Sequence, residues 1–197
     1  MFYFSSDIHF SDKDTLLNDN RPFKSTKQFD KFIIRTWNKQ TKKDDTIYVI
    51  GDFVDCNGEG HDSWKKSILY VKKLKANVIL ILGNNEERVI KHYFNNNFEE
   101  FKKYCLSIGF KEVYKNLTIS LNGITFYLVH KPKDYKKGYL NLFGHMHRSG
   151  GLYKPFGFNI GCDLNHFRLY NEKDIEHLLY MKEKYWNTDK SLNISIT

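Results

Sequence analysis

The first half of the chain alternates short runs of consecutive apolar residues with longer stretches of helical periodicity. The apolar runs are typical of strands that are buried on both faces. They span residues 2–4, 46–50 and 77–82. The periodic stretches predict helices over residues 25–40, 63–74 and 86–109, with a break expected around residues 95–97. This order of strands and helices predicts a parallel sheet that is covered by helices on both faces.

The second half has a different pattern. Asn122 and Gly123 separate two short apolar stretches, at residues 117–121 and 124–129, which is a strong signal for a two-residue hairpin. Further strands are expected within residues 139–143 and 151–160, with turns at glycine and at Pro155. A last helix is expected over residues 172–185, and residues 188–197 are either a strand or a loose tail. We expect one domain over residues 1–197, with two β-rich layers packed on each other.

The composition is that of an ordinary folded domain. The chain has 197 residues, of which 41% are hydrophobic and 27% charged, so it is long enough to bury a sizeable core. No apolar run is long enough for a membrane span, and residues 1–10 lack the features of a signal peptide. A cytoplasmic location is the default expectation. The widely spaced Cys56, Cys105 and Cys162 are expected to be free thiols.

The net charge of +8 favours anionic partners, with phosphate esters and nucleic acid as the obvious classes. Many of the lysines, however, alternate with apolar residues at helical spacing, which is the pattern of a solvated helix face. Nucleic-acid binding that rested on charge alone would weaken steeply with salt and would not respond to metal removal.

Polar residues with metal-binding chemistry follow the expected strands, mostly beside glycine. They are Asp7 and His9, Asp52 and Asp55, Asn84 to Glu86, His130, and His145 with His147. The carboxyl ends of parallel strands meet at one edge of a sheet, so these loops should converge. Carboxylate, imidazole and amide oxygen suit Mn²⁺, Fe²⁺ or Zn²⁺. The potential ligands are too many for one tetrahedral ion, which favours a two-metal site.

These blocks resemble the calcineurin-like metallophosphoesterases, in particular small bacterial or phage-type members. The resemblance rests on Asp-x-His at residues 7–9, Gly-Asp-x-x-Asp at 51–55, Gly-Asn at 83–84, His130, and Gly-His-x-His at 144–147. It covers residues 1 to about 165, with the motifs in family order. The fold that it implies is a four-layer α/β/β/α sandwich, which agrees with the two β-rich layers expected above.

The resemblance also implies a role for each of these residues. Asp7, His9 and His147 would hold one metal ion; Asn84, His130 and His145 would hold the second; Asp52 would bridge both. The cofactors would be two divalent ions chosen from Mn²⁺, Fe²⁺, Zn²⁺ and Ni²⁺, with Mn²⁺ favoured. A hydroxide between the ions would attack phosphorus in line, while the metals and Asn84 neutralise the phosphoryl oxygens.

Asn85 departs from the resemblance, because many family members have histidine at this position. Asparagine can donate a hydrogen bond but cannot transfer a proton at neutral pH. The chain could therefore be a slower enzyme, a phosphodiesterase in which Asn85 contacts a non-bridging oxygen, or a metal-bearing scaffold without turnover. The intact ligand set favours the enzyme. We expect a phosphodiesterase whose substrate is a phosphate ester, with nucleotides and nucleic-acid fragments as candidates.

Other polar residues near the motifs have two interpretations each. Arg21 could reach a substrate phosphate, or it could belong to an ordinary turn anchored by Phe23. Asp55 could orient a ligand histidine or cap its loop. Glu86 could hydrogen-bond nearby groups, but its place at a helix start already explains a carboxylate.

The remaining histidines have no partner motif and are expected to be surface or core residues: His61, His92, His166 and His177. His166 is the closest of them to a motif, because it follows a strand near the expected site. Cys56 and Cys162 are expected to be small buried residues and not ligands.

Overall fold

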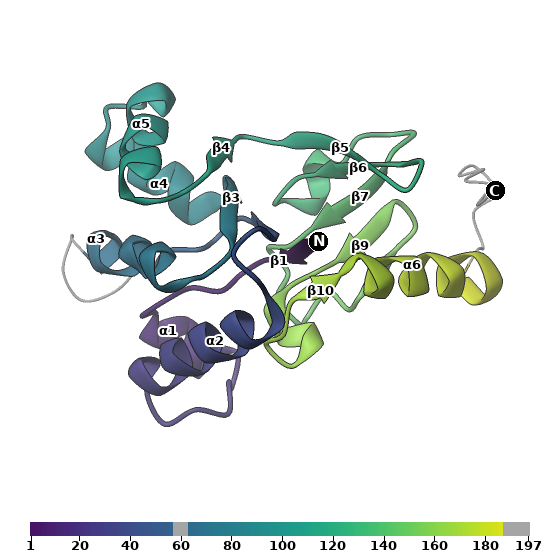
Figure 1. The fold of residues 1–197 in the computed structure, drawn as a ribbon, viewed down its shortest axis with the longest axis horizontal. Coiled ribbons are helices and arrows are strands. Elements are labelled where there is room, and N and C mark those ends of the chain that lie inside the picture. Colours follow the sequence, from purple (N-terminus) through teal and green to yellow (C-terminus); the bar gives the residue numbers. More distant parts are fainter. Residues whose placement is uncertain (57–62, 187–197) are drawn as a thin grey trace.

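The computed structural model describes residues 1–56 and 63–186, which form two five-stranded sheets flanked by helices (Figure 1). The first sheet has the order β10-β1-β2-β3-β4, and all its pairs are parallel except β10 with β1. Its strands are β1 (Phe2–Ser5), β2 (Thr46–Ile50), β3 (Asn77–Ile81), β4 (Glu112–Tyr114) and β10 (Tyr170–Asn171).

The first sheet is buried on both faces, as its continuous apolar runs indicated, but the prediction that helices cover both faces was wrong, because the second sheet covers one of them. In β2, Ile47 and Val49 belong to the core beneath the helices, whereas Tyr48 and Ile50 belong to the core between the two sheets. Successive strand residues point to opposite faces, so a strand that is covered on both sides must be apolar throughout.

The second sheet has the order β5-β6-β7-β9-β8. Its strands are β5 (Leu117–Leu121), β6 (Ile124–Leu128), β7 (Leu140–Phe143), β8 (Tyr153–Lys154) and β9 (Gly157–Asn159). The hairpin between β5 and β6 turns at Asn122 and Gly123, both at positive φ, as a two-residue turn requires. Phe126, Leu128 and Leu142 face the first sheet and complete the inter-sheet core.

The helices carry the apolar stripes that cover these sheets. They are α1 (Lys13–Asn18), α2 (Thr26–Gln40), α3 (Ser63–Ser67), α4 (Asn84–Tyr93), α5 (Phe98–Ile108) and α6 (Glu172–Met181). Helices α1 to α5 gather around the outer side of the first sheet (Figure 1), and the Ser25 side chain caps the start of α2 by accepting from the Gln28 N–H. Two sheets with flanking helices confirm the predicted α/β metallophosphoesterase fold.

Several element boundaries differ from the sequence prediction. The helix expected over residues 63–74 becomes 3₁₀ from Ile68 to Lys73, and the helix expected over residues 86–109 breaks at residues 94–97. The short elements α1, β4 and β10 were not predicted, because segments of two to six residues carry too little periodicity. Helix α6 ends at Met181 and a π turn follows it. His61 and the expected strand or tail at 188–197 lie outside the described residues.

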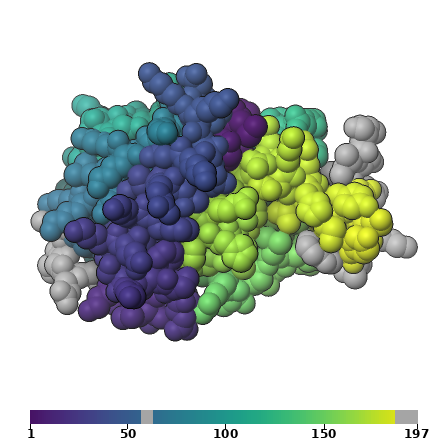
Figure 2. All heavy atoms as spheres, turned by 60° about the horizontal axis from the view of Figure 1, so that its bottom comes forward, coloured from purple at the N-terminus to yellow at the C-terminus, as the bar shows by residue number. Residues whose placement is uncertain are grey.

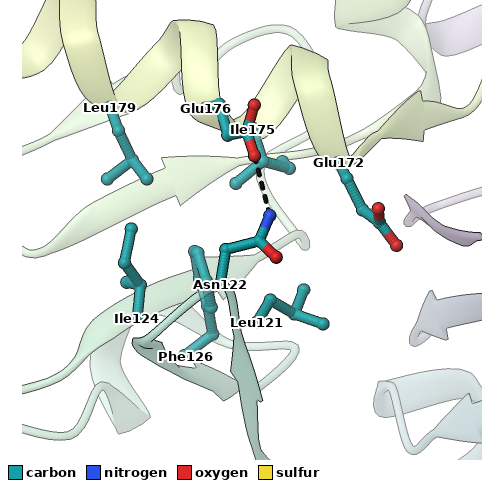
Figure 3. Close-up of a pocket in the computed structure, with 8 residues that line it drawn as sticks. All are labelled: Leu121, Asn122, Ile124, Phe126, Glu172, Ile175, Glu176 and Leu179. Atoms are coloured by element: carbon teal, nitrogen blue, oxygen red, sulfur yellow. Dashed lines mark hydrogen bonds between the residues drawn. The ribbon is translucent and has the colours of Figure 1, made fainter. Parts of the chain in front are cut away.

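Helix α6 closes the sandwich beside β10 and the hairpin tip. Ile175, Leu178 and Leu179 add its apolar face to the inter-sheet core. A small apolar pocket separates α6 from the hairpin (Figure 3), and the Asn122 side-chain amide donates to Glu176 across it at 2.8 Å. The hairpin is thereby tied to the last helix, away from the strand ends that carry the polar motifs.

Residues far apart in sequence meet where the chain leaves the first sheet. In Figure 2 the early, purple-to-blue part of the chain packs directly against the green and yellow later part. Trp37 donates from its indole nitrogen to the Phe167 carbonyl, and Arg21 pairs with Asp163 across the same boundary. The loops after β1 and β7 meet along this boundary.

Candidate metal centre

The polar motifs converge at one edge of the two sheets, as the strand topology predicted. Asp7 and His9 follow β1, Asp52 follows β2, and Asn84 opens α4 directly after β3. From the second sheet, His130 follows β6, and the turn after β7 supplies His145 and His147. Each side chain is thus held at the end of a buried strand, where the backbone is rigid.

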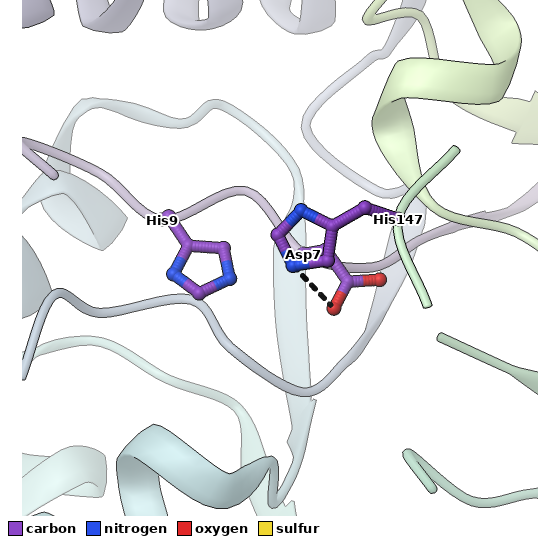
Figure 4. A group of neighbouring side chains, drawn as sticks. All are labelled: Asp7, His9 and His147. Carbon is purple, nitrogen blue, oxygen red and sulfur yellow. Dashed lines mark ion pairs between the residues drawn. The ribbon is translucent and has the colours of Figure 1, made fainter. Parts of the chain in front are cut away.

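Within the described residues these side chains form two compact groups. Asp7, His9 and His147 form the first group (Figure 4), and Asp52, His130 and His145 form the second. In each group the potential ligand atoms lie within 4.8 Å of one another. In the first group, Nε2 of His147 lies 3.7 Å from the Asp7 carboxylate. These are the two sets into which the resemblance divides the same residues.

Asp52 lies between the two groups. Its Oδ2 is 3.5 Å from Nε2 of His9 and 3.4 Å from Nε2 of His130, so one carboxylate oxygen faces a histidine of each group. Burial alone would raise the pKa of Asp52, but His130, His9 and the Asn85 N–H hold it well below the usual range. The side chain is therefore an ionised carboxylate placed where a bridging ligand would be.

Asn84 joins the second group through its carbonyl oxygen. Its Oδ1 lies 3.1 Å from Nε2 of His130 and 2.8 Å from Nδ1 of His145. The other ring nitrogen of His130, Nδ1, lies 2.9 Å from the Ile50 carbonyl. In the neutral ring, a proton on Nδ1 for that carbonyl would leave the Nε2 lone pair available to a metal ion beside Asp52 and Asn84.

Many of these residues have a backbone conformation that is rare for residues other than glycine. Positive φ angles occur at Asp7 (58°), His9 (53°), Asp52 (52°), His145 (71°) and His147 (43°). Such conformations cost free energy, of the order of 1–3 kcal/mol each, and they cluster at functional sites. The fold therefore maintains a strained backbone at the edge where the polar side chains converge.

Glycine allows the ligand loops to approach one another. Gly51 has φ of +83°, and a Cβ there would collide with the His130 ring. A Cβ at Gly144 would collide with Ser6 and lie 2.5 Å from the Asp7 carboxylate. The glycines beside the polar residues are thus a packing requirement of the site itself.

The residues present fit divalent metal ions. Nε2 of His9 is buried and makes no hydrogen bond among the described residues, although it points at the Asp52 carboxylate. A buried ring nitrogen without a hydrogen bond is costly unless a ligand occupies it. The donor set of carboxylate, imidazole and amide oxygen suits Mn²⁺, Fe²⁺ and Zn²⁺.

Glu86 has a larger role than its place at a helix start indicated. Its carboxylate is fully buried and accepts hydrogen bonds from four backbone N–H groups of the strand-end loops. The donors are Asp52, Phe53, Val54 and Gly83. Glu86 therefore holds the Asp52 loop against the start of α4. The expected role at the helix start is present, because Glu86 accepts from the N–H of the N-cap residue Gly83, but it accounts for only one of these four contacts.

Asn85 is buried beneath the site and holds the loop that carries Asp52. It is only 1% exposed, its side-chain nitrogen donates to the Val54 carbonyl at 2.9 Å, and its backbone N–H donates to Asp52 at 2.9 Å. The same side-chain nitrogen lies 3.2 Å from Nδ1 of His9. These contacts give no support to a direct contact between Asn85 and substrate, because the amide is enclosed by protein.

Arg21 is also enclosed. Its guanidinium donates to Asp163 at 2.8 and 2.9 Å and to the carbonyls of Asp7 and Ile8 at 2.7 and 2.8 Å. It also lies over the Phe29 ring. Its donors are used inside the protein, so these contacts support the turn interpretation over a contact to substrate phosphate. Arg21 anchors the loop that carries Asp7.

The sequence analysis did not identify two acidic residues that contact the histidines of the first group. Asp12 lies 3.2 Å from Nδ1 of His9, and Asp19 pairs with Nδ1 of His147. Asp12 follows His9 by three residues, which could have drawn attention to it. Nothing in the local sequence connects Asp19 with His147, because the pair spans 128 residues.

The other candidate residues behave simply. Asp55 is buried, and its backbone N–H donates to Ser67. The described histidines without a motif are exposed, as expected: His92, His166 and His177. The cysteines are unpaired as predicted; Cys162 is buried, but Cys56 is only half-buried, contrary to expectation.

Comparison with known proteins agrees with this geometry. The sequence profile of the family described as calcineurin-like phosphoesterase matches residues 1–190. The chain belongs to the calcineurin-like phosphoesterase family. Membership supports a hydrolase of phosphate esters, and the two side-chain groups are candidate sites for the divalent metals that this family typically binds. Among the described residues, no helix combines the length and apolarity needed to cross a lipid bilayer.

The relatives compared individually with this chain are distant. An uncharacterised protein of Methanocaldococcus jannaschii is 25% identical over 130 residues, which is 66% of this chain and 58% of that protein. A protein of unknown function from Aquifex aeolicus shares the fold, with a TM-score of 0.62 and 24% identity over 90% of this chain and 98% of that chain.

Two more solved structures lie further away and carry no argument about activity. They are the nuclease MPE of Pseudomonas putida (TM-score 0.46, 18% identity, 74% of this chain and 60% of that chain) and the phosphoesterase Yfce from E. coli (TM-score 0.43, 13% identity, 81% and 77%).

Proposed function

We propose that this family member is a metal-dependent phosphodiesterase with two divalent ions. Asp7, His9 and His147 would hold the first ion; Asn84, His130 and His145 would hold the second. The observation that carries the proposal is the position of Asp52. One of its carboxylate oxygens, Oδ2, lies 3.5 Å from Nε2 of His9 and 3.4 Å from Nε2 of His130. A carboxylate between two histidine-containing groups can bridge two metal ions, which supports a two-metal site.

Two bound ions would activate a water for in-line attack on phosphorus and neutralise the charge that develops on the phosphoryl oxygens. The protein holds the surrounding groups in place. Glu86 fixes the Asp52 loop, the Ile50 carbonyl orients His130, and the Asp7 carboxylate accepts from the His145 N–H. His145 is exposed, which leaves an approach for substrate from solvent.

The leaving group receives no proton from the residue after Gly83-Asn84. Asn85 is an amide and is buried behind His9, so it can neither transfer a proton nor reach the ester. General acid catalysis is typically worth about 10²–10⁴ in rate. We therefore propose that turnover depends on a leaving group that is itself acidic enough to depart unprotonated.

A hollow beside the second group supports a diester over a monoester. It has a volume of about 190 Å³, and His130 forms part of its wall. The polar side chains that line it are Glu87, Lys115, Asn116, Tyr127, Lys131 and Asp134. It is smaller than the sites of about 300–1,000 Å³ that hold drug-sized ligands. Its size and its mixture of donors and acceptors suit one hydroxyl-rich arm, such as the sugar of a nucleotide.

The metal and the location complete the proposal. Mn²⁺ is favoured, with Fe²⁺, Zn²⁺ and Ni²⁺ as alternatives, because oxygen and nitrogen ligands predominate and no cysteine belongs to the two groups. Unpaired cysteines fit a reducing compartment such as the cytosol. The substrate would be a phosphodiester of the nucleotide or nucleic-acid class.

The decisive experiment is Mn²⁺-dependent hydrolysis of bis-p-nitrophenyl phosphate beside p-nitrophenyl phosphate, with Asp52→Asn as the control. Asn retains an oxygen for the Asn85 N–H but removes the shared negative charge. Diester turnover that disappears in the control supports the proposal. No turnover of either ester by protein that binds Mn²⁺ would leave the second candidate, a metal-bearing binding module, which the absence of a histidine at position 85 favours.

A further inference from the structure

Helix α1 is a short segment with an acidic residue at each end, and each acid reaches a different histidine of the first group. Asp12 is the N-cap residue of α1 and Asp19 is its C-cap residue. Asp12 lies 3.2 Å from Nδ1 of His9, and Asp19 contacts Nδ1 of His147. Both histidines of the first group are therefore supported by carboxylates from one element.

The Asp12 carboxylate is held in a defined orientation. It is buried, and it accepts from the Thr15 N–H and from the Thr15 hydroxyl, each at 2.8 Å. A carboxylate fixed beside Nδ1 of His9 favours the tautomer that carries its proton on Nδ1, and the Nε2 of that tautomer points at Asp52.

Asp19 acts on His147 from the other end of α1. The buried Leu16 fixes the helix to the core, and Arg21 fixes the following turn to Asp163 at 2.8 Å. The second carboxylate near His147, that of Asp163, lies 4.0 Å from the ring and is already paired with Arg21. Asp19 is therefore the carboxylate in direct contact with Nδ1 of His147.

Among the described residues, no carboxylate supports a histidine of the second group from behind. Nδ1 of His130 lies 2.9 Å from the neutral Ile50 carbonyl. Nδ1 of His145 faces the amide oxygen of Asn84 at 2.8 Å, so this contact lies within the proposed ligand set. A carboxylate behind a ligating histidine raises the basicity of the ring and fixes its orientation more strongly than a neutral acceptor does.

We propose that Asp12 and Asp19 are positioning residues that make the Asp7–His9–His147 group the tighter metal site, which a divalent ion fills before the other. The inference rests on the proposed two-metal function. It goes beyond it, because it assigns different affinities to the two sites and names the residues outside the ligand set that cause the difference.

Calorimetric titration of the metal-free protein with Mn²⁺ tests this inference. The wild type should show a tight and a weak binding event. Asp12→Asn and Asp19→Asn should each weaken the tight event by about 10–100-fold and leave the weak event unchanged. Asp14→Asn is the matched control, because Asp14 is an exposed carboxylate of the same helix, and it should change neither event.

Asparagine is chosen because it is as good an N-cap as aspartate, so α1 should remain folded. Thermal unfolding of each metal-free variant checks this point. Electron paramagnetic resonance then provides a separate readout. After one equivalent of Mn²⁺ the wild type should show isolated ions, and Asp12→Asn should already show spin-coupled pairs, because its two sites have become similar.

Two equal events in the wild type, or a loss confined to the weak event in the Asp12 and Asp19 variants, would overturn the inference. The proposed function fails separately: Mn²⁺ would bind in two distinct steps, as described, but neither phosphate ester would be hydrolysed.

Discussion

The side-chain nitrogen of Asn85 lies 3.2 Å from Nδ1 of His9, the same ring nitrogen that faces the Asp12 carboxylate at 3.2 Å. Nδ1 can accept a hydrogen bond from Asn85 or donate one to Asp12, but it cannot do both. A metal ion at Nε2 requires the proton on Nδ1 and therefore selects the pairing with Asp12. Asn85 is thus a buried neighbour of a proposed ligand histidine.

Replacement of Asn85 by alanine should lower stability and leave substrate affinity unchanged. The Val54 carbonyl would lose its hydrogen bond inside the protein, which costs about 1–3 kcal/mol in the free energy of unfolding. Chemical denaturation and the diester KM measure the two effects. A large rise in KM with unchanged stability would instead show that Asn85 contacts substrate.

Replacement of Glu86 by alanine should cost more than about 3 kcal/mol, because four buried backbone N–H groups would lose a charged acceptor. Mn²⁺ affinity should fall with it, since the Asp52 loop would be released. The matched control is Glu99→Ala, which removes a first-turn carboxylate from α5 and should cost only about 0.3–1 kcal/mol. Equal costs for the two variants would restore the helix-dipole explanation.

Mn²⁺ affinity should increase with pH because the metal ion competes with a proton on His130. Burial lowers the pKa of His130, but the neighbouring Asp52 carboxylate dominates and raises it to about 9 in the metal-free protein. A metal ion must displace that proton, so the apparent Mn²⁺ affinity should rise about tenfold per pH unit up to about pH 9. Calorimetry in buffers of different ionisation enthalpy would measure the released proton, and affinity that does not change over this range would contradict the assignment.

The same group gives the metal-free protein an opposite trend. The pKa of His130 is raised above its ordinary 6.5, so its pairing with Asp52 contributes stability that is fully present below that value. This contribution should disappear as the pH rises from about 6.5 through about 9. Denaturation of metal-free protein across that window checks the sign.

The rate should depend steeply on the leaving group. No proton donor stands at position 85, so esters with poor leaving groups must expel an alkoxide or phenoxide without help from that residue. A series of aryl phosphodiesters with different phenol pKa values would show this as a steep fall of kcat/KM with leaving-group pKa. A shallow dependence would mean that another group protonates the leaving oxygen.

Substitutions in the hollow beside His130 should raise KM for diesters but not for monoesters. Asn116→Ala and Lys115→Ala remove polar groups from its lining and should raise KM for a dinucleotide without changing KM for p-nitrophenyl phosphate. Lys103→Ala, an exposed lysine of α5, serves as the control for lost positive charge. If all three variants raise KM equally, the effect is general electrostatic attraction and not recognition in the hollow.

Sequence patterns were sufficient for the long elements because those elements carry their own periodicity. The continuous apolar runs of β2 and β3 predicted a sheet buried on both faces, and Asn122-Gly123 predicted the hairpin. The strand β10 pairs with β1 across the whole chain and has two residues, so no local pattern could indicate it.

The sequence by itself determined which residues gather at the edge of the sheets. Each of them follows a strand directly, and parallel strand ends must converge, so Asp7, Asp52 and Asn84 were placed by topology alone. Their role as metal ligands stays a prediction that Mn²⁺ binding will test. The tertiary structure decided which way the neighbouring side chains point.

Asn85 and Glu86 show why the orientation of a side chain at a helix start depends on the folded structure. Consecutive residues at the start of a helix can face the core or the solvent, and the choice depends on the buried donors and acceptors that distant segments supply. For Glu86 these are the N–H groups after β2, and for Asn85 the Val54 carbonyl and the His9 ring. Contacts between residues so far apart in sequence leave no trace in a local pattern.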